Sequence, residues 1–149
     1  MKIALGSDHA GFFLKEYLRD RLKSEGFEVV DLGTHYPDPT DYPIYAQKVA
    51  RALLSGEADF GVLICKTGLG MSIAANRFKG IRAGLCLTPE YAEISRRHNN
   101  ANIICFGAGY IDRDEAYDIL MKFLNTPFDG DKPAGARHKR RVELIDKTD

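Results

Sequence analysis

The sequence predicts a three-layer α/β/α fold: a doubly wound, Rossmann-like sheet of about five parallel strands. Short apolar runs typical of buried strands alternate about five times with segments of helical periodicity, and this order favours a parallel sheet covered on both faces. The length of 149 residues suits one domain spanning 1–149. A hydrophobic content of 44% and a charged content of 28% are typical of a globular chain.

The first 65 residues are expected to form three strands and two helices. Apolar runs bounded by polar or turn residues predict strands at 2–7, 27–32 and 60–65. A helix over 12–24, closed by Gly26, is predicted from apolar residues spaced by three and four, namely Phe13, Leu14, Tyr17, Leu18 and Leu22. After a loop over 33–41, a second helix is expected from about Pro43 to Ser55, burying Tyr45, Val49 and Leu53.

The remainder of the chain repeats this alternation. The loop Lys66–Gly70 precedes a helix over 71–77, and two further strands are predicted at 83–87 and 103–106. Helices are predicted over 89–98 and about 113–125, the second burying Ala116, Ile119, Leu120 and Phe123. A turn-rich segment over 129–135 leads into a basic helical tail from about residue 137, beginning with Arg137–Arg141.

Composition narrows the function classes. Lys and Arg number 21 and Asp and Glu number 21, so the formal net charge of zero argues against a general nucleic-acid binder. We find neither a charged leader before a long apolar stretch nor an apolar run of membrane length, so a cytoplasmic protein without a membrane partner is expected. Three cysteines fit a reducing compartment better than a disulfide scaffold.

Polar residues gather near the predicted strand ends. In doubly wound sheets the ligand crevice lies at the carboxyl ends of the strands. Ser7–Gly11 follows the first strand, Cys65–Gly70 spans the end of the third, and Arg96–Asn100 precedes the fifth. We therefore expect these three segments to meet at one crevice.

The loop Cys65–Gly70 is the most informative segment. Gly68 and Gly70 can adopt backbone angles that other residues avoid, so that successive amides and the following helix start face an anion, either a phosphate or a developing negative oxygen. The loop matches neither the P-loop nor the dinucleotide-binding pattern. Cys65 is a candidate base or nucleophile in this setting, although a lone cysteine at a strand end is more often a small buried hydrophobe.

The other candidates each have two interpretations. Asp8 and His9 form an acid–base pair, or Asp8 caps a turn beside an incidental His9. His98 complements a helix dipole or acts in chemistry, and Asn99 and Asn100 can be cap residues. The segment Arg137–Arg141 is a solvated surface or a phosphate clamp. Tyr42 is expected to be a packing residue, and His35 and His138 have no assigned role. The three cysteines, Cys65, Cys86 and Cys105, lack the spacing of metal ligands.

Seven motifs, in order, resemble the type B ribose-5-phosphate isomerases and the related galactose-6-phosphate isomerase subunits, nearly from end to end. They are Ser7-Asp8-His9-Ala10-Gly11, Asp41-Tyr42-Pro43, Cys65-x-Thr67-Gly68-Leu69-Gly70, Ile73-Ala74-Ala75-Asn76, Gly80-Ile81-Arg82-Ala83, His98-Asn99-x-Ala101-Asn102 and Arg137-His138-x-x-Arg141. The resemblance implies an aldose–ketose isomerase that works through an enediolate without metal or redox cofactor. It also implies a homodimer or a tetramer whose sites are shared across the interface.

The resemblance also implies roles for individual residues. Cys65 would move a proton between carbons 1 and 2, Thr67 would shuttle hydroxyl protons, and His98, with Asp8 nearby, would open the furanose ring. Backbone amides from Lys66 to Gly70, including Gly68 and Leu69, would hold the enediolate oxygen together with Asn99. The residues implied to bind phosphate or line the pocket are His9, Arg137, Arg141 and Tyr42.

Three departures from the family pattern concern the anion-binding end. Lys66 stands where the family usually has glycine, which would strain the backbone if a positive φ were needed, and its ammonium could instead reach the substrate or the partner. Gly109 stands where many members have arginine, and Asp131–Ala136 looks like an insertion. A 6-phosphorylated hexose such as allose or galactose 6-phosphate, another sugar, or a non-catalytic phosphosugar-binding module therefore remain alternatives to ribose 5-phosphate. A thiol redox protein is disfavoured because a Cys-x-x-Cys pair is missing.

Overall fold

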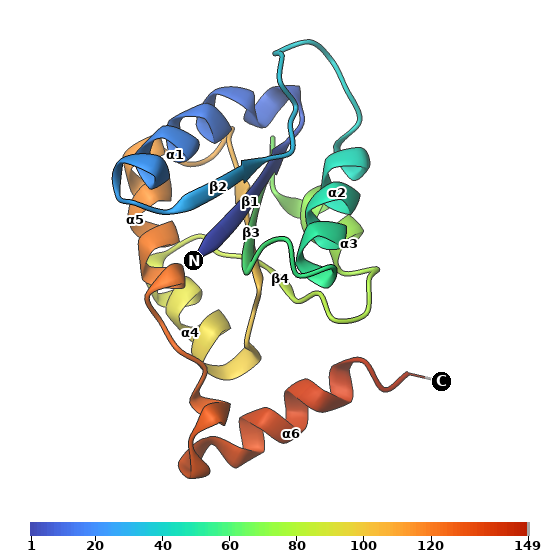
Figure 1. The fold of residues 1–149 in the computed structure, drawn as a ribbon, viewed down its shortest axis with the longest axis vertical. Helices are drawn as coiled ribbons and strands as arrows, with labels where there is room; N and C mark the ends of the chain where they lie inside the picture. Colours follow the sequence, from blue (N-terminus) through green and yellow to red (C-terminus); the bar gives the residue numbers. More distant parts are fainter. Residues whose placement is uncertain (149) are drawn as a thin grey trace.

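The computed structural model describes residues 1–148 and contains a five-stranded parallel sheet with helices on both faces (Figure 1). The sheet order is β2-β1-β3-β5-β4, with every neighbouring pair parallel. The strands are β1 (Lys2–Ser7), β2 (Glu28–Asp31), β3 (Phe60–Cys65), β4 (Ala83–Leu85) and β5 (Ile103–Gly107). The predicted doubly wound α/β/α fold is therefore confirmed.

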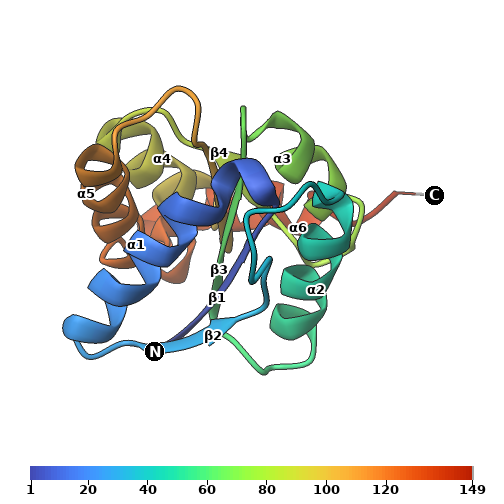
Figure 2. The same cartoon turned by 90° about the horizontal axis from the view of Figure 1, so that it is seen from above.

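Helices on the two faces enclose separate apolar cores. On one face lie α1 (Phe12–Ser24), α4 (Pro89–Asn99) and α5 (Arg113–Leu124), and on the other lie α2 (Tyr42–Leu54) and α3 (Leu69–Ala75). Figure 2 shows the two layers on either side of the strands. The last helix, α6 (Ala136–Ile145), lies beyond one end of the sheet (Figure 1). None of the helices within residues 1–148 is long and apolar enough to cross a bilayer.

Most predicted elements recur with shifted ends. The helix expected from residue 71 begins at Leu69, because Gly68, in the left-handed region at φ 79°, turns the chain directly into it. The strand expected to reach residue 87 ends at Leu85, where an edge strand pairs with β5 alone. Short 3₁₀ turns occupy 9–11, 129–131 and 133–135, where the sequence indicated turns.

Phe13 is the main exception to the predicted helix faces. Its side chain is 74% exposed, whereas Leu14, Leu18 and Leu22 pack into the core. These three leucines recur every four residues and form one stripe, while Phe13 lies beside that stripe, edge-on to Phe12. The predicted burial of Ala116, Ile119, Leu120 and Phe123 on α5 is confirmed.

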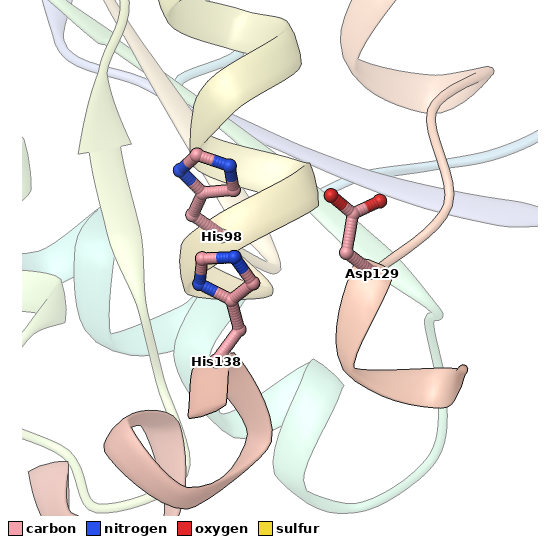
Figure 3. Close-up of side chains that lie close together, drawn as sticks. All are labelled: His98, Asp129 and His138. Atoms are coloured by element: carbon pink, nitrogen blue, oxygen red, sulfur yellow. The ribbon is translucent and has the colours of Figure 1, made fainter. Parts of the chain in front are cut away.

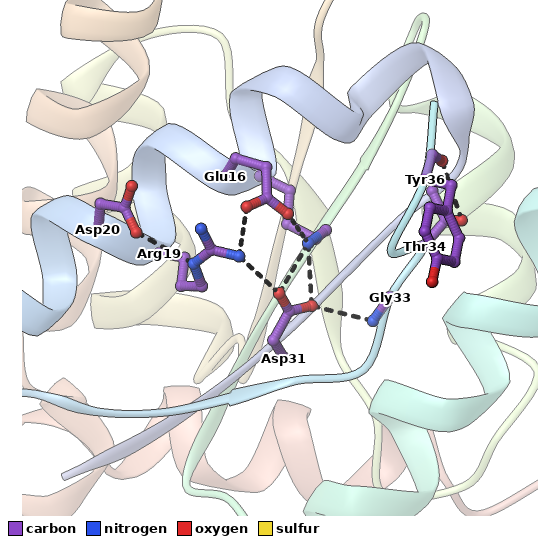
Figure 4. Close-up of polar contacts among 8 residues, drawn as sticks. Glu16, Arg19, Asp20, Asp31, Gly33, Thr34 and Tyr36 are labelled. Atoms are coloured by element: carbon purple, nitrogen blue, oxygen red, sulfur yellow. Dashed lines mark hydrogen bonds and ion pairs between the residues drawn. The ribbon is translucent and has the colours of Figure 1, made fainter. Parts of the chain in front are cut away.

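A buried ion pair ties α1 to the end of β2. Lys15 is fully buried, and its Nζ donates to Asp31 Oδ1 and Oδ2 at 2.9 and 2.8 Å. The Gly33 amide donates to Asp31 Oδ1 at 3.0 Å, and Glu16 and Arg19 complete the network (Figure 4). Although burial acts to raise it, these hydrogen bonds from Lys15 and Gly33 hold the pKa of Asp31 below its ordinary value.

The winding direction of the chain reverses between β1 and β3. The path from β1 through α1 leads outward to β2, whereas the path from β3 leads through α3 and β4 on the other side. Because all strands are parallel, their carboxyl ends share one edge of the sheet. The ends of β1 and β3 meet at that edge, which is the place where doubly wound sheets bind ligands.

Candidate active site

One group of expected residues lies where β1 and β3 end. We call Asp8, His9, Tyr42, Cys65 and Thr67 the carboxyl-edge cluster. Asp8 is buried, and its Oδ1 accepts the Ala10 and Gly11 amides at 3.0 and 3.2 Å, so the capping interpretation of Asp8 is confirmed. The exposed His9 ring accepts the Thr40 amide on Nδ1 at 3.1 Å. A neutral ring accepting at Nδ1 carries its proton on Nε2, so His9 offers a donor at that atom.

The loop after β3 folds around the Cys65 sulfur. Cys65 is 5% exposed and packs in the same core as Met71 and Ala75, and its Sγ accepts the Gly68 amide at 3.2 Å. The exposed Thr67 accepts the Leu69 amide on Oγ1 at 3.2 Å. The amides of Gly68 and Leu69, which were expected to face a ligand, therefore already have hydrogen-bond acceptors inside the loop. The hydrogen bond from the Gly68 amide holds the Cys65 sulfur in position, two residues before the exposed Thr67.

The two glycines of this loop serve different purposes. Gly68 has the positive φ expected of it, and a Cβ there would come 2.6 Å from Leu85 Cδ1. Gly70 does not have a positive φ, so the prediction of special backbone angles is wrong for it. A Cβ on Gly70 would lie 2.6 Å from the Tyr42 ring. The absence of a side chain at Gly70 lets Tyr42 pack directly over the loop.

A second group of residues lies at the opposite edge of the sheet. We call His98, Asn99, His138 and Arg141 the amino-edge cluster, which lines a cavity of about 360 Å³ between α4 and α6. The His98 and His138 rings stack with centroids 4.2 Å apart and planes 8° apart, and Asp129 lies beside them (Figure 3). Arg137, also on α6, is exposed and donates to the Ala134 carbonyl at 3.2 Å.

The expectation that Arg96–Asn100 joins the other polar segments at one crevice is wrong within a single chain. The helix α4 starts at the carboxyl end of β4 and must return the chain to the amino end of β5. His98 and Asn99 at its last turn therefore lie at the amino edge, and the expected proximity of Asp8 and His98 does not occur within the chain. Asn100, at φ 49°, is the predicted C-cap.

Burial and neighbouring charges affect the ionisable groups of the amino-edge cluster. Burial lowers the pKa of His138 below its ordinary value, and the positive charge of Arg137 acts in the same direction. Arg97 Nε donates to Asp129 Oδ2 at 3.1 Å and holds that carboxylate against the histidines. His138 has no role in the sequence analysis, although its place beside Arg137 in the motif Arg137-His138-x-x-Arg141 could have indicated one. Asp129 and Arg97 belong to none of the motifs, so the sequence did not indicate that they lie beside the histidines.

The amino-edge histidines do not form a metal site as they stand. The possible ligand atoms of His98, Asp129 and His138 lie within 4.8 Å of one another. An imidazole binds a metal ion in the plane of its ring through a nitrogen lone pair. Because the two rings are stacked almost parallel, their lone pairs do not converge on one point, and Asp129 is engaged by Arg97.

The remaining cysteines are packing residues. Burial raises the pKa of both the Cys86 and the Cys105 thiols, and Cys105 lies in the centre of the sheet. Cys86 Sγ lies 3.6 Å from the Ser95 hydroxyl. Cys86 lines a cavity of about 520 Å³ together with Thr67, whereas Cys65 is the cysteine that directly precedes the loop residues Lys66–Gly70.

Lys66 and Gly109, two of the residues that depart from the family pattern, are in contact. Lys66 is exposed and does not have a positive φ, so the possible backbone strain at this position is absent. The Lys66 carbonyl accepts the Gly109 amide at 3.0 Å. A Cβ on Gly109 would lie 3.2 Å from Lys66 Cγ and 3.4 Å from Cε. The lysine stem therefore crosses the bare α-carbon of Gly109.

Comparisons with known proteins point to one family of isomerases. The family model described as ribose/galactose isomerase matches residues 3–145. The chain is 46% identical to ribose-5-phosphate isomerase B of Escherichia coli, covering 97% of this chain and 93% of the relative. The solved ribose 5-phosphate isomerase of Thermotoga maritima superposes with a TM-score of 0.94 at 52% identity, covering 99% and 98% of the two chains. The Mycoplasma genitalium ribose-5-phosphate isomerase B, solved with bound ribulose-5-phosphate, gives 0.88 at 38% identity, covering 97% and 93%.

Proposed function

The chain belongs to the ribose/galactose isomerase family, and on that premise we propose that it interconverts ribose 5-phosphate and ribulose 5-phosphate through a cis-enediolate. This reaction makes it an aldose–ketose isomerase, and close relatives are named ribose-5-phosphate isomerase B and probable ribose-5-phosphate isomerase B. The reaction needs a base, a donor for an oxyanion and a grip on the phosphate. The residues implied for these tasks are all present, and the observation that carries the proposal is the placement of Cys65 and Thr67 at the switch between β1 and β3.

Cys65 is the proposed base. Its thiolate takes the proton from carbon 2 of the open aldose, the electrons form the enediolate, and the same proton returns to carbon 1 to give the ketose. Thr67 moves the hydroxyl proton between the oxygens on carbons 1 and 2. The Gly68 amide supports this assignment because it donates to Sγ at 3.2 Å and so orients the sulfur.

The phosphate and ring-opening groups come from both edges of the sheet. His9, with its proton on Nε2, is proposed to bind the phosphate together with Arg137 and Arg141. His98 is proposed to open the furanose ring, and Asn99 to help hold the enediolate oxygen. Tyr42 lines the pocket over Gly70. Charged donors that hold a phosphate contribute binding energy, because charge-assisted hydrogen bonds to its oxygens are stronger than neutral ones.

We propose a homodimer in which each site combines the carboxyl-edge cluster of one protomer with the amino-edge cluster of its partner. The separation of the two clusters supports this arrangement, because one sugar phosphate cannot touch opposite edges of the same sheet. Arg137 and Arg141 are both exposed, so that their guanidinium groups can reach another copy. The cytoplasm is the proposed compartment, since all three cysteines are unpaired.

Turnover of a defined sugar panel tests the proposed function. The purified protein is assayed with ribose 5-phosphate, allose 6-phosphate, galactose 6-phosphate and the corresponding free sugars, with a chelator present throughout. We expect the highest kcat/KM for ribose 5-phosphate, unchanged by the chelator. A clear preference for a hexose phosphate, or complete loss of turnover in chelator, would contradict the substrate or the metal-free mechanism respectively.

A further inference from the structure

The carboxyl-edge cluster lacks a permanent positive charge of its own. None of its five members is a lysine or an arginine, and Asp8 is an acid whose Oδ1 is held by two backbone amides. The arginines proposed for the phosphate lie at the other edge of the sheet. A sugar phosphate brings two negative charges to this place, and the enediolate adds a third. A cation on the same protomer as Cys65 would therefore lower the free energy of the bound substrate.

The position of Lys66 makes it the candidate for this cation. It lies between Cys65 and Thr67, its side chain is exposed, and no carboxylate within residues 1–148 is paired with its ammonium. Its carbonyl is fixed by the Gly109 amide at 3.0 Å, and the neighbouring Cys65 carbonyl accepts the Ala108 amide at 2.9 Å. The backbone that carries the lysine is thus tied to the loop after β5.

Gly109 determines the course of the lysine side chain. A Cβ at Gly109 would stand 3.2 Å from Lys66 Cγ and 3.4 Å from Cε, so the stem lies along the glycine from near its root to its end. A stem held along a surface loses less conformational entropy on binding than one that moves freely. Cys65, by contrast, packs in the core shared with α2 and α3. The sulfur is thus buried, whereas the Lys66 side chain is exposed.

We propose that Lys66, held over Gly109, is a substrate-specificity residue that binds the phosphate of the sugar at the carboxyl edge of the sheet. This inference rests on the proposed function for the identity of the ligand. It predicts an effect on phosphate binding and on KM rather than on kcat, because the charge acts on a group that does not change during the proton transfer.

Inorganic phosphate is the probe for the test. Its Kd is measured by calorimetry, and its Ki against ribose 5-phosphate by kinetics, for the wild type, Lys66→Met and Lys66→Arg. We expect Lys66→Met to raise Kd, Ki and KM about tenfold with kcat within about twofold, and Lys66→Arg to stay within about threefold of the wild type. The matched control is Lys23→Met, which removes one exposed charge from α1 and should leave Kd unchanged.

Gly109→Ala supplies a second variant. The added methyl requires the Lys66 stem to shift by a few tenths of an ångström, so any change in phosphate binding that it causes in the wild-type background should disappear in the Lys66→Met background. A Kd for Lys66→Met within twofold of the wild type, an equal loss in Lys23→Met, or a fall in kcat at constant Ki would each overturn the proposal. A wild type that binds phosphate through Lys66 but does not isomerise ribose 5-phosphate would overturn the proposed function and leave this anion site standing.

Discussion

At the residue scale, Cys65 is buried, as one of its two sequence interpretations predicts, and its role as a base stays a proposal. It is a small buried residue in the α2–α3 core, and its sulfur is also the acceptor of a loop amide at 3.2 Å. Burial is compatible with the proposed role because Cys65 is the last residue of β3 and the exposed Thr67 follows two residues later. At a strand end a core residue can have a polar neighbour on its open side.

Cys65→Ala should abolish catalysis while leaving substrate binding nearly intact. Loss of a positioned general base costs about 10²–10⁴ in rate, so kcat should fall by that factor with KM changed by less than about threefold. Steady-state kinetics with ribose 5-phosphate measure both. Cys86→Ala is the matched control, since it removes another buried strand-end thiol and should retain activity. Turnover of Cys65→Ala near that of the wild type would show that another group is the base.

At the element scale, the Lys15–Asp31 pair connects α1, β2 and the loop that follows. Asp31 binds both the fully buried ammonium and the Gly33 amide that begins the loop over 33–41. The same loop carries Thr40, whose amide holds the His9 ring. A buried pair is costly to break because the remaining charge loses its partner in a place that water does not reach.

Asp31→Asn should destabilise the fold by about 3 kcal/mol at neutral pH, measured by urea unfolding. The pKa of Asp31 is lowered in the folded state, so the unfolded state binds the proton more tightly. The stabilisation is therefore complete above the unfolded pKa of about 3.9 and is lost as the pH falls through the folded pKa. The difference between wild type and variant should shrink accordingly in acid.

The control for this pair is Asp20→Asn. Asp20 pairs with Arg19 at the surface, with its side chain 70% exposed, and such pairs contribute about 0–1 kcal/mol. Equal losses of stability in Asp20→Asn and Asp31→Asn would contradict the assignment of the stabilising effect to the buried pair.

At the scale of the whole molecule, the parallel topology sorts the candidate residues into two groups. Every strand ends at one edge and every returning helix ends at the other, so residues following a strand and residues preceding one are kept apart. The helix α6 adds Arg137, His138 and Arg141 to the second group by lying beyond the amino edge (Figure 1). A site that uses both groups needs two copies of the chain.

Complementation between two inactive variants tests the shared site. Cys65→Ala and His98→Asn are each expected to lose most activity. In a mixed dimer one site carries both substitutions and the other carries neither, so random pairing on co-expression should restore about one quarter of wild-type turnover per protomer. Activity of the co-expressed pair equal to the mean of the two separate variants would indicate a site built within one chain.

The sequence by itself determined the fold class, the order of elements and the loop Cys65–Gly70, because strand and helix periodicity and turn residues act over a few neighbouring positions. It also carried the motifs that mark the family. The tertiary structure alone decided that His98 lies at the opposite edge from Asp8, that its ring stacks on His138, and that Lys66 lies along Gly109. These contacts join residues about 40 or more positions apart, or separate residues that local patterns place together. They depend on how the helices return the chain across the sheet, which no local pattern encodes.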